Sequence, residues 1–365
     1  MNKNNPSRRK FLKSGLATAA TIGMSTLPAG SLNSKPEKLA WEPKISENIA
    51  DLSDSTLRWM KQLGMNHVVF QGISGIDLDN KQYWTYDDVM KAKKQCDKFE
   101  MELSSMLIPI EWYPKACLGQ QGRDEEIERV IKCINSAGKA GIPVLEWRLF
   151  PDFFWDERVG YGKVEGRGGA PCSNFNYDRI KDKPPFEGIG IVSAPEMWDR
   201  TLYFAKPIIE AAEKAGVKMS CHPNDPPVAN MRGCARIQTS IEGVQRLLDE
   251  IPSPANGITF CQGTYTEMGV NVFDAIRHFG KQKKIFHVHL RAVRGKIPNY
   301  TEVFMDEGDI DMFEALKTYR EIGYMGTIVS DHTPRVEADT PFGHIGRTFS
   351  HGYIRAMVQS VNKLT

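Results

Sequence analysis

Hydrophobic and polar positions follow two alternating patterns along most of the chain. Short runs rich in β-branched and aromatic residues, such as HVVFQ at 67–71 and KIFHVHL at 284–290, are typical of buried strands. Between them lie longer stretches whose apolar residues recur at helical spacing, as in 123–139. The pattern therefore predicts strands and amphipathic helices in regular alternation.

This alternation predicts eight strand–helix units. The expected strands are 38–42, 67–71, 102–108, 143–149, 217–222, 257–261, 284–290 and 327–331. The expected helices are 54–63, 86–99, 123–139, 197–215, 239–250, 272–279, 309–322 and 348–364. Repeated βα units imply a parallel sheet, and eight of them in about 330 residues predict an α/β protein with a (β/α)₈ TIM barrel. No G-x-G-x-x-G follows any strand, which argues against a dinucleotide-binding fold.

The stretch 150–193, after the fourth strand, is rich in glycine, proline and aromatic residues and shows no clear periodicity. We expect it to be an insertion within one barrel domain that spans residues 36–365. Long insertions in compact domains commonly serve as lids or as contacts between subunits. Both roles, and the possibility of a homo-oligomer, stay open at this point.

Residues 1–30 carry a different pattern. SRRKFLK at 7–13 precedes a short apolar run of small residues at 15–24. A basic start before a short apolar core is typical of an export signal, and this core is too short to span a bilayer permanently. The paired arginines resemble the twin-arginine signal of bacteria. We therefore expect a periplasmic protein with no stable membrane anchor once the signal is removed.

The composition narrows the class of protein. The chain has 365 residues, 41% of them hydrophobic and 25% charged, which is typical of a globular protein. Its 47 basic and 45 acidic residues leave a net charge of +2 with no long basic block, so nucleic acid is not an expected partner. Seven cysteines at irregular spacing, without a CxxC, argue against a complete disulfide framework.

Four chemically suggestive residues stand at the ends of successive predicted strands. The fifth to eighth strands end at His222, Cys261, His289 and Asp331, which we call the strand-end quartet. The carboxyl ends of barrel strands form the active-site rim, so these side chains should meet. Each alone is more often a structural residue than a ligand. Together they suit a borderline divalent ion such as Mn²⁺, Fe²⁺, Co²⁺ or Zn²⁺.

Groups suited to proton transfer and anion binding surround this rim. His332 directly follows the quartet's aspartate and is a candidate general acid or base. Arg291 and Arg236 are candidates to hold a substrate carboxylate with two hydrogen bonds each. Glu146 and Arg148, at the end of the fourth strand, either face the substrate or form a salt bridge beneath the rim.

Several segments resemble a known family, the mannonate dehydratases of the xylose-isomerase-like (β/α)₈ type. The segments are GRDEEIERVIKCINSAGKAGI (122–142), CHPNDPP (221–227), RI (236–237), SPANGITFCQGT (253–264), FHVHLR (286–291), GDIDMFEALK (308–317) and SDH (330–332). The resemblance implies that the strand-end quartet binds the metal and that His332 is catalytic. It also implies a lyase of hexuronate catabolism, a branch of carbohydrate metabolism, that dehydrates D-mannonate to 2-keto-3-deoxy-D-gluconate. We expect Mn²⁺ as the ion, with Fe²⁺, Co²⁺, Zn²⁺ and Mg²⁺ as alternatives.

The chain departs from this family at positions expected to face the substrate. Pro109-Ile110-Glu111-Trp112 replaces a His-Glu-Asp stretch, and Arg148-Leu149-Phe150-Pro151 replaces an Asn-Phe-Met-Pro-like loop. Asn224 replaces an aspartate in HPDDPP. A tyrosine near the C-terminal Gly/Arg segment is absent, and His344 stands nearby as a candidate substrate-binding group. The metal-binding motifs are retained, so substrate recognition is where we expect this chain to differ.

Two other classes of function fit parts of the pattern. A metal-dependent sugar isomerase or epimerase of the same barrel superfamily would also move a proton next to a carbonyl group. A non-catalytic periplasmic sugar-binding protein would have no need of a metal beside a histidine. We therefore expect an enzyme acting on a small-molecule sugar acid, with isomerase or epimerase chemistry as the alternative.

Overall fold

A curled parallel sheet forms the centre of the protein. The computed structural model describes residues 40–71, 82–150 and 156–365. The sheet has the strand order β1-β15-β12-β11-β8-β5-β4-β3-β2, and every pairing in it is parallel. Its strands are β1 (Lys44–Ile45), β2 (Asn48–Ile49), β3 (His67–Phe70), β4 (Glu102–Leu107), β5 (Val144–Trp147), β8 (Lys218–Cys221), β11 (Asn256–Cys261), β12 (Ile285–His289) and β15 (Thr327–Val329).

One extended segment closes this sheet into a barrel. β1 and β2 are separated by only Ser46 and Glu47, so they act as a single strand. Through β1 the segment pairs with β15, and through β2 it pairs with β3. The two edges of the sheet are thereby joined, and the predicted (β/α)₈ architecture is confirmed.

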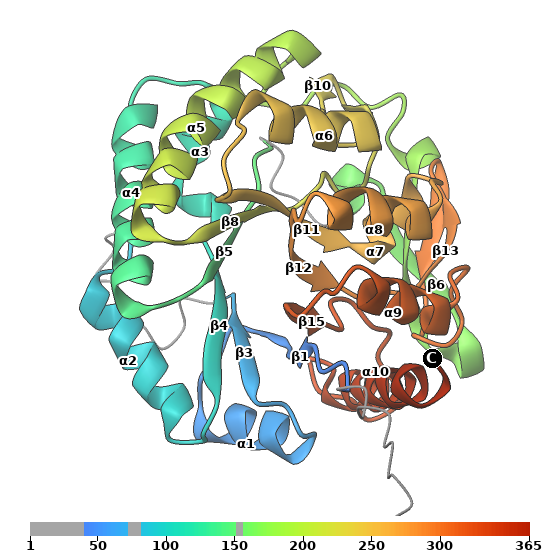
Figure 1. Cartoon of the computed structure of the whole chain (residues 1–365). Coiled ribbons are helices and arrows are strands. Elements are labelled where there is room, and N and C mark those ends of the chain that lie inside the picture. Colours follow the sequence, from blue (N-terminus) through green and yellow to red (C-terminus); the bar gives the residue numbers. More distant parts are fainter. Residues whose placement is uncertain (1–39, 72–81, 151–155) are drawn as a thin grey trace, which may run out of the picture. The chain divides into compact units, whose positions relative to one another are not determined.

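Helices surround the strands on the outside (Figure 1). They are α1 (Asp54–Gln62), α2 (Tyr86–Asp97), α3 (Pro114–Leu118), α4 (Arg123–Ala140), α5 (Ala194–Ala215), α6 (Ile241–Glu250), α7 (Gln262–Glu267), α8 (Val272–Lys281), α9 (Met312–Glu321) and α10 (His344–Leu364). Local sequence signals set their ends. The Thr85 hydroxyl caps α2 in a capping box with Asp88, and Gly141 ends α4 with a left-handed φ of 78°.

The first strand lies later in the chain than the pattern predicted. Residues 38–42 were expected to form it, but the strand pairing begins at Lys44. Trp41 instead packs against the end of the barrel, where its indole nitrogen donates to the Tyr324 carbonyl at 2.6 Å. Trp41 therefore serves packing rather than strand pairing. Residues 38 and 39 lie outside the described part of the chain.

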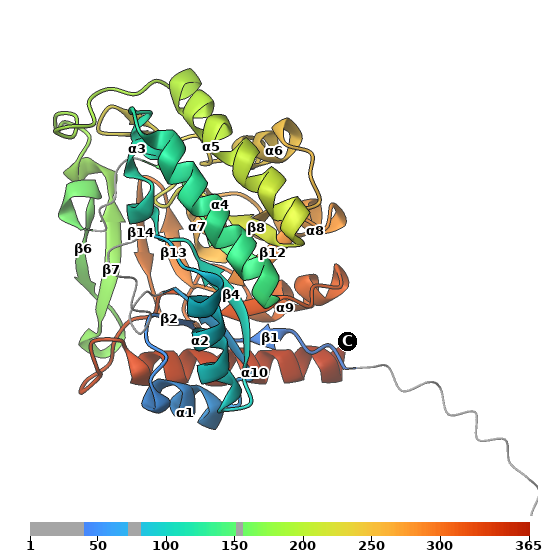
Figure 2. The ribbon, with the colours of Figure 1, turned by 90° about the vertical axis from the view of Figure 1, so that its left-hand side faces the viewer.

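The insertion contains strands that its irregular pattern did not predict. β6 (Tyr161–Glu165) and β7 (Pro171–Asn176) join β13 (Val293–Lys296) and β14 (Asn299–Glu302) in an antiparallel sheet of order β13-β14-β7-β6. A second, two-stranded sheet pairs β9 (Asn230–Met231) with β10 (Cys234–Ala235). Figure 2 shows the four-stranded sheet at one end of the barrel. Because β13 follows β12, this is the carboxyl end of the parallel strands.

The expected export signal at residues 1–30 lies outside the described residues, as do residues 151–155 of the insertion. Within the described part, no helix is long and apolar enough to cross a membrane. All seven cysteines are described, and each is buried with a free thiol.

Candidate metal and catalytic site

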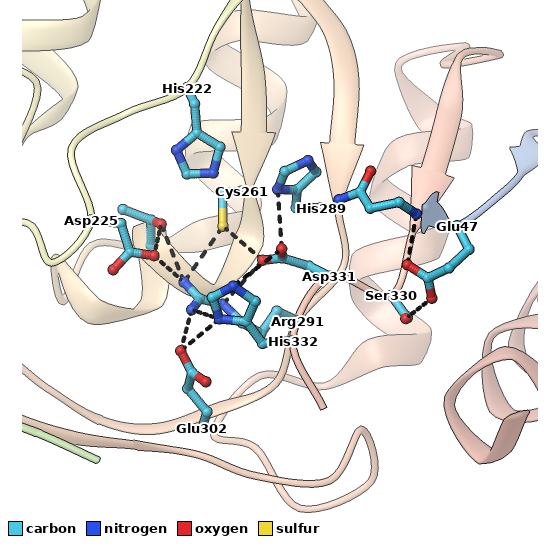
Figure 3. A network of polar contacts seen from close by, with 12 residues as sticks. Glu47, His222, Asp225, Cys261, His289, Arg291, Glu302, Ser330, Asp331 and His332 are labelled. Carbon is cyan, nitrogen blue, oxygen red and sulfur yellow. Dashed lines mark hydrogen bonds and ion pairs between the residues drawn. The ribbon is translucent and has the colours of Figure 1, made fainter. Parts of the chain in front are cut away.

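The structure brings the strand-end quartet together at the carboxyl rim of the barrel (Figure 3). The ligand atoms of His222, Cys261 and His289 all lie within 4.8 Å of one another. Asp331 joins them, with Oδ2 3.7 Å from the Cys261 sulfur and Oδ1 3.5 Å from His289 Nδ1. All four residues are buried. His289 Nδ1 has no hydrogen-bond partner among the described residues, and an ion bound by this donor set would satisfy it.

The backbone at Asp331 adopts an unusual conformation. Its φ of 56° lies in the left-handed region, which costs a non-glycine residue roughly 1–2 kcal/mol. Such conformations persist only where the surrounding structure holds them, and they cluster at functional sites. Here the conformation occurs where the chain leaves β15 and places the carboxylate beside Cys261 and His289.

Glu146 lies behind the quartet and contacts His289 from the opposite side. Its Oε2 lies 3.2 Å from His289 Nε2, while its Oε1 accepts from Arg148 Nη2 at 3.0 Å. Burial alone would lower the pKa of His289, but the carboxylates of Asp331 and Glu146 outweigh it and raise that pKa well above its usual value. A carboxylate on the far nitrogen of a ligating histidine fixes the ring and its tautomer.

Glu146, His287 and His289 form a second group whose geometry suits a metal ion. His287 Nδ1 is already engaged, 2.5 Å from the Thr327 hydroxyl. Burial lowers the pKa of His287 to about 3, so its ring is neutral at physiological pH. This second group shares His289 with the quartet, which makes the two groups alternative or adjacent positions within one site.

Arg291 is a buried counter-ion within the site. Its guanidinium lies 2.7 Å from Asp225, 2.9 Å from Glu267 and 2.5 Å from Glu302. Arg291 Nη2 is also 3.6 Å from the sulfur of Cys261. Burial alone would raise the pKa of the Cys261 thiol, but the guanidinium outweighs it and lowers that pKa to about 6. Arg291 thus favours the thiolate, which is the form that binds metals.

His332 lies beside the quartet with its side chain 42% exposed. Its Nδ1 is 2.8 Å from Glu302 Oε1, and its Nε2 is 3.6 Å from Asp331 Oδ1. Burial alone would lower the pKa of His332, but the carboxylates of Asp331 and Glu302 outweigh it and raise that pKa to about 9. The imidazole is therefore protonated at neutral pH, which is the form that a general acid requires.

A cavity of about 430 Å³ opens beside the strand-end quartet and His332, a size typical of small-molecule sites. Its wall is formed by Asn48, Ala50, Gln71, Arg148, Tyr161, Ser173, His222, Asp225, His289, Glu302, Asp331, His332, Phe342 and Arg347.

Not every candidate from the sequence belongs to the lining of that cavity. Arg236 is buried and donates from Nη1 to the Pro226 carbonyl at 2.9 Å, so it supports the loop after β8. Arg291 faces the protein carboxylates described above. His344 Nδ1 lies 2.6 Å from the Thr340 hydroxyl, and its ring packs edge-on against Trp59. Arg148 does line the cavity, next to Glu146.

Sequence reasoning missed several cavity residues, and two of them make informative contacts. Tyr161, from the inserted strand β6, donates its hydroxyl to Asp225 Oδ1 at 2.8 Å. Arg347, near the start of α10, forms an ion pair with the buried carboxylate of Glu47, with Nη1 2.8 Å from Oε1. The Gly/Arg motif around Arg347 could be recognised in the sequence. Its ion-pair partner, Glu47, could not, because it lies 300 residues earlier in the chain.

Comparisons with known proteins point to one family. Residues 171–365 match the family model described as D-mannonate dehydratase (UxuA). The mannonate dehydratase of Thermotoga maritima is 28% identical over 333 residues, covering 80% of this chain and 92% of that protein. The enzyme of Streptococcus equi subsp. zooepidemicus is 29% identical over 330 residues, covering 80% and 90%.

Solved structures agree with these sequence matches. The mannonate dehydratase from Streptococcus suis serotype 2 superposes with a TM-score of 0.78 at 26% identity, covering 88% of this chain and 95% of that one. A 3-keto-D-glucoside 4-epimerase from E. coli superposes with a TM-score of 0.56 at 12% identity, covering 86% of this chain and 100% of that one. The second match reflects the shared barrel fold alone.

Proposed function

The chain belongs to the D-mannonate dehydratase family, and on that premise we propose that it is a metal-dependent hydro-lyase converting D-mannonate to 2-keto-3-deoxy-D-gluconate. One observation supports this most strongly. Four ligand atoms of mixed nitrogen, sulfur and oxygen type converge beside a protonated histidine in a cavity of substrate size. This arrangement offers both an ion site and a proton donor to one bound molecule.

We assign the ion to the strand-end quartet and propose Mn²⁺. The mixed donor set also suits Fe²⁺, Co²⁺ or Zn²⁺, while Mg²⁺ prefers all-oxygen sites. When bound, the ion supplies Lewis acidity that favours negative charge on the substrate carboxylate and its neighbouring hydroxyl. Glu146 holds His289 in the orientation that directs Nδ1 toward Asp331.

His332 is the proposed general acid. Glu302 holds its Nδ1, and Nε2, which lies 3.6 Å from Asp331 Oδ1, is the atom that we assign to a substrate hydroxyl. In the dehydration a general base takes the proton from C2, and the hydroxyl leaves from C3. In our proposal that hydroxyl takes a proton from His332 and leaves as water. The resulting enol then converts to the 2-keto acid.

Arg148 is the proposed partner of the substrate carboxylate, in the place that the sequence gave to Arg291 and Arg236. It lines the cavity, and Glu146 Oε1 fixes its Nη2. The other oxygen of Glu146 faces His289, so Glu146 is the single residue that connects Arg148 to the quartet. A guanidinium at this place can hold a carboxylate next to the ion.

Export to the periplasm by a twin-arginine signal remains part of the proposal. It is supported by SRRKFLK at 7–13 and the apolar run that follows. That route carries folded proteins, which suits an enzyme that acquires its metal before export. A fusion of residues 1–30 to a reporter should be exported, and Arg8→Lys with Arg9→Lys should abolish this. A reporter that stays inside the cell would contradict the assignment.

The ligand assignment is tested by metal analysis. Purified His222→Ala and Cys261→Ser variants should lose stoichiometric metal and dehydratase activity together. Cys133→Ser is the matched control, because Cys133 is equally buried but lies on α4. Stoichiometric metal in both ligand variants would rule out the assignment. An epimerised sugar acid in place of a 2-keto-3-deoxy acid would support the isomerase or epimerase alternative.

A further inference from the structure

Arg347 presents a fixed guanidinium to the cavity. Its Nη1 lies 2.8 Å from Glu47 Oε1, and its Nε donates to the Phe342 carbonyl at 3.0 Å. The guanidinium carbon also lies 4.4 Å from the centre of the Phe342 ring. Nη2 has no partner within residues 40–71, 82–150 and 156–365. One nitrogen of a well-held guanidinium is therefore free to donate to a ligand.

Glu47 anchors this arginine and balances its charge. It is fully buried, accepts from the Asn48 backbone at 2.7 Å and lies 2.8 Å from His351 Nε2. Burial alone would raise the pKa of Glu47, but Arg347 and His351 outweigh it and lower that pKa to about 2. Since the ionised carboxylate already balances the guanidinium, an acceptor in the cavity need not be an anion.

The same carboxylate ties Arg347 to the reacting end of the site. Glu47 Oε2 accepts from the hydroxyl of Ser330, the residue before Asp331. Figure 3 shows Glu47 and Ser330 on one side of Asp331 and Arg291 with His332 on the other. Arg347 is thus held at a defined place relative to the quartet.

Asn48 adds a second polar group to this wall of the cavity. It follows Glu47 in the chain and lines the same cavity as Arg347. Its side-chain oxygen is buried and has no hydrogen-bond partner within the described residues. A buried acceptor without a partner is costly, and a ligand hydroxyl would satisfy it. A donor and an acceptor in the lining of one cavity suit a polyhydroxylated chain.

The groups at the reacting end are already assigned, which leaves Arg347 for another part of the substrate. The quartet, His332 and Arg148 serve the carboxylate, C2 and C3. We propose that Arg347 is a specificity residue whose Nη2 donates to a hydroxyl of the sugar chain beyond C4. This inference rests on the proposed dehydration of a six-carbon sugar acid. It makes Arg347 a binding residue for the non-reacting end of the substrate.

The test compares two substrates across two enzymes. One substrate is D-mannonate, and the other is the four-carbon aldonate with the same configuration at C2 and C3. Arg347→Met should lower kcat/KM for D-mannonate by about 10- to 100-fold, the usual effect of losing a hydrogen bond from a charged group. For the four-carbon acid, which lacks the C5 and C6 hydroxyls of D-mannonate, the same substitution should change kcat/KM by less than about threefold. The effects on kcat/KM of shortening the substrate and of replacing Arg347 should therefore not be additive.

Arg355→Met is the matched control. Arg355 lies on the same helix but donates to the Gly64 carbonyl at 3.0 Å and lies away from the cavity. It should leave both kcat/KM values within about twofold of wild type. Metal content and unfolding midpoint are measured for every variant. If Arg347→Met fails to fold, Arg347→Lys decides, because lysine keeps the charge beside Glu47 but lacks the second guanidinium nitrogen.

The outcomes separate the two proposals. A selective loss for D-mannonate in a folded, metal-loaded variant supports the assignment of Arg347. Equal losses for both substrates, or no loss for D-mannonate, overturn it and leave the dehydratase proposal standing. A wild-type enzyme that dehydrates neither acid overturns the proposed function itself.

Discussion

Replacing Arg291 with methionine removes the buried cation on which three carboxyl groups converge. The guanidinium lies 2.7 Å from Asp225, 2.9 Å from Glu267 and 2.5 Å from Glu302. Methionine is an unbranched apolar side chain that can fill most of the vacated space. The main effect of Arg291→Met is therefore electrostatic.

The magnitude follows from which carboxyl groups lose their partner. Burial raises the pKa of Glu267 well above its usual value, so Glu267 is the carboxyl group that most readily takes up a proton once the guanidinium is gone. Glu302 keeps His332 at 2.8 Å. Asp225 keeps only neutral donors such as Tyr161 among the contacts described above. One carboxylate is thus left without a counter-ion, which costs about 3–5 kcal/mol when a buried pair is broken from one side.

Urea unfolding of the metal-free protein measures this cost. Arg277→Met is the control, since Arg277 also pairs with a carboxylate, Glu321 at 2.9 Å, but at the surface. An exposed pair contributes about 1 kcal/mol or less. We expect Arg291→Met to lower the free energy of unfolding by about 3–5 kcal/mol and the control by no more than about 1. Equal losses in the two variants would refute the view that Arg291 is the counter-ion of the site.

Three further predictions concern other contacts of the site. Glu146→Gln should weaken metal affinity by about 10- to 100-fold in equilibrium dialysis, because Glu146 orients His289, and unchanged affinity would deny it that role. Glu47 has a folded pKa of about 2 against an ordinary 4.5, so its stabilising effect is present above pH 4.5 and is lost as the pH falls toward 2. The difference in unfolding free energy between wild type and Glu47→Gln should therefore narrow across that window, and a constant difference would contradict the argument. Tyr161→Phe should lower the free energy of unfolding by about 1.5–3 kcal/mol in urea, as expected for a hydrogen bond to a carboxylate, and no change would show that the Asp225 contact contributes nothing.

The barrel and the quartet could be predicted from sequence for one physical reason. The carboxyl ends of parallel strands in a closed barrel share one rim, so the last residue of a strand has a known place. β11 ends at Cys261, as predicted, and β12 ends at His289, one residue before the end of the predicted strand 284–290. Position along the chain therefore translated directly into position in space.

The contacts that shape the cavity could not be predicted in this way. Tyr161 reaches Asp225 because β6 pairs with β7 and β7 with β14, and no periodicity in 150–193 indicated those pairings. Arg291 is an arginine, the type of residue that commonly binds a substrate carboxylate. Only the positions of Asp225 and Glu302, which come from separate loops and strands, show it to be a counter-ion. Non-local partners of this kind leave no local signal in the sequence.

The central claim is tested most directly by the product formed from D-mannonate. Wild-type protein loaded with Mn²⁺ should release 2-keto-3-deoxy-D-gluconate, and the amount of product should match the D-mannonate consumed. His332→Asn, loaded to the same metal content, should form it at least about 100-fold more slowly because the proton donor is gone. Absence of the 2-keto-3-deoxy acid with metal-loaded wild-type protein would contradict the account.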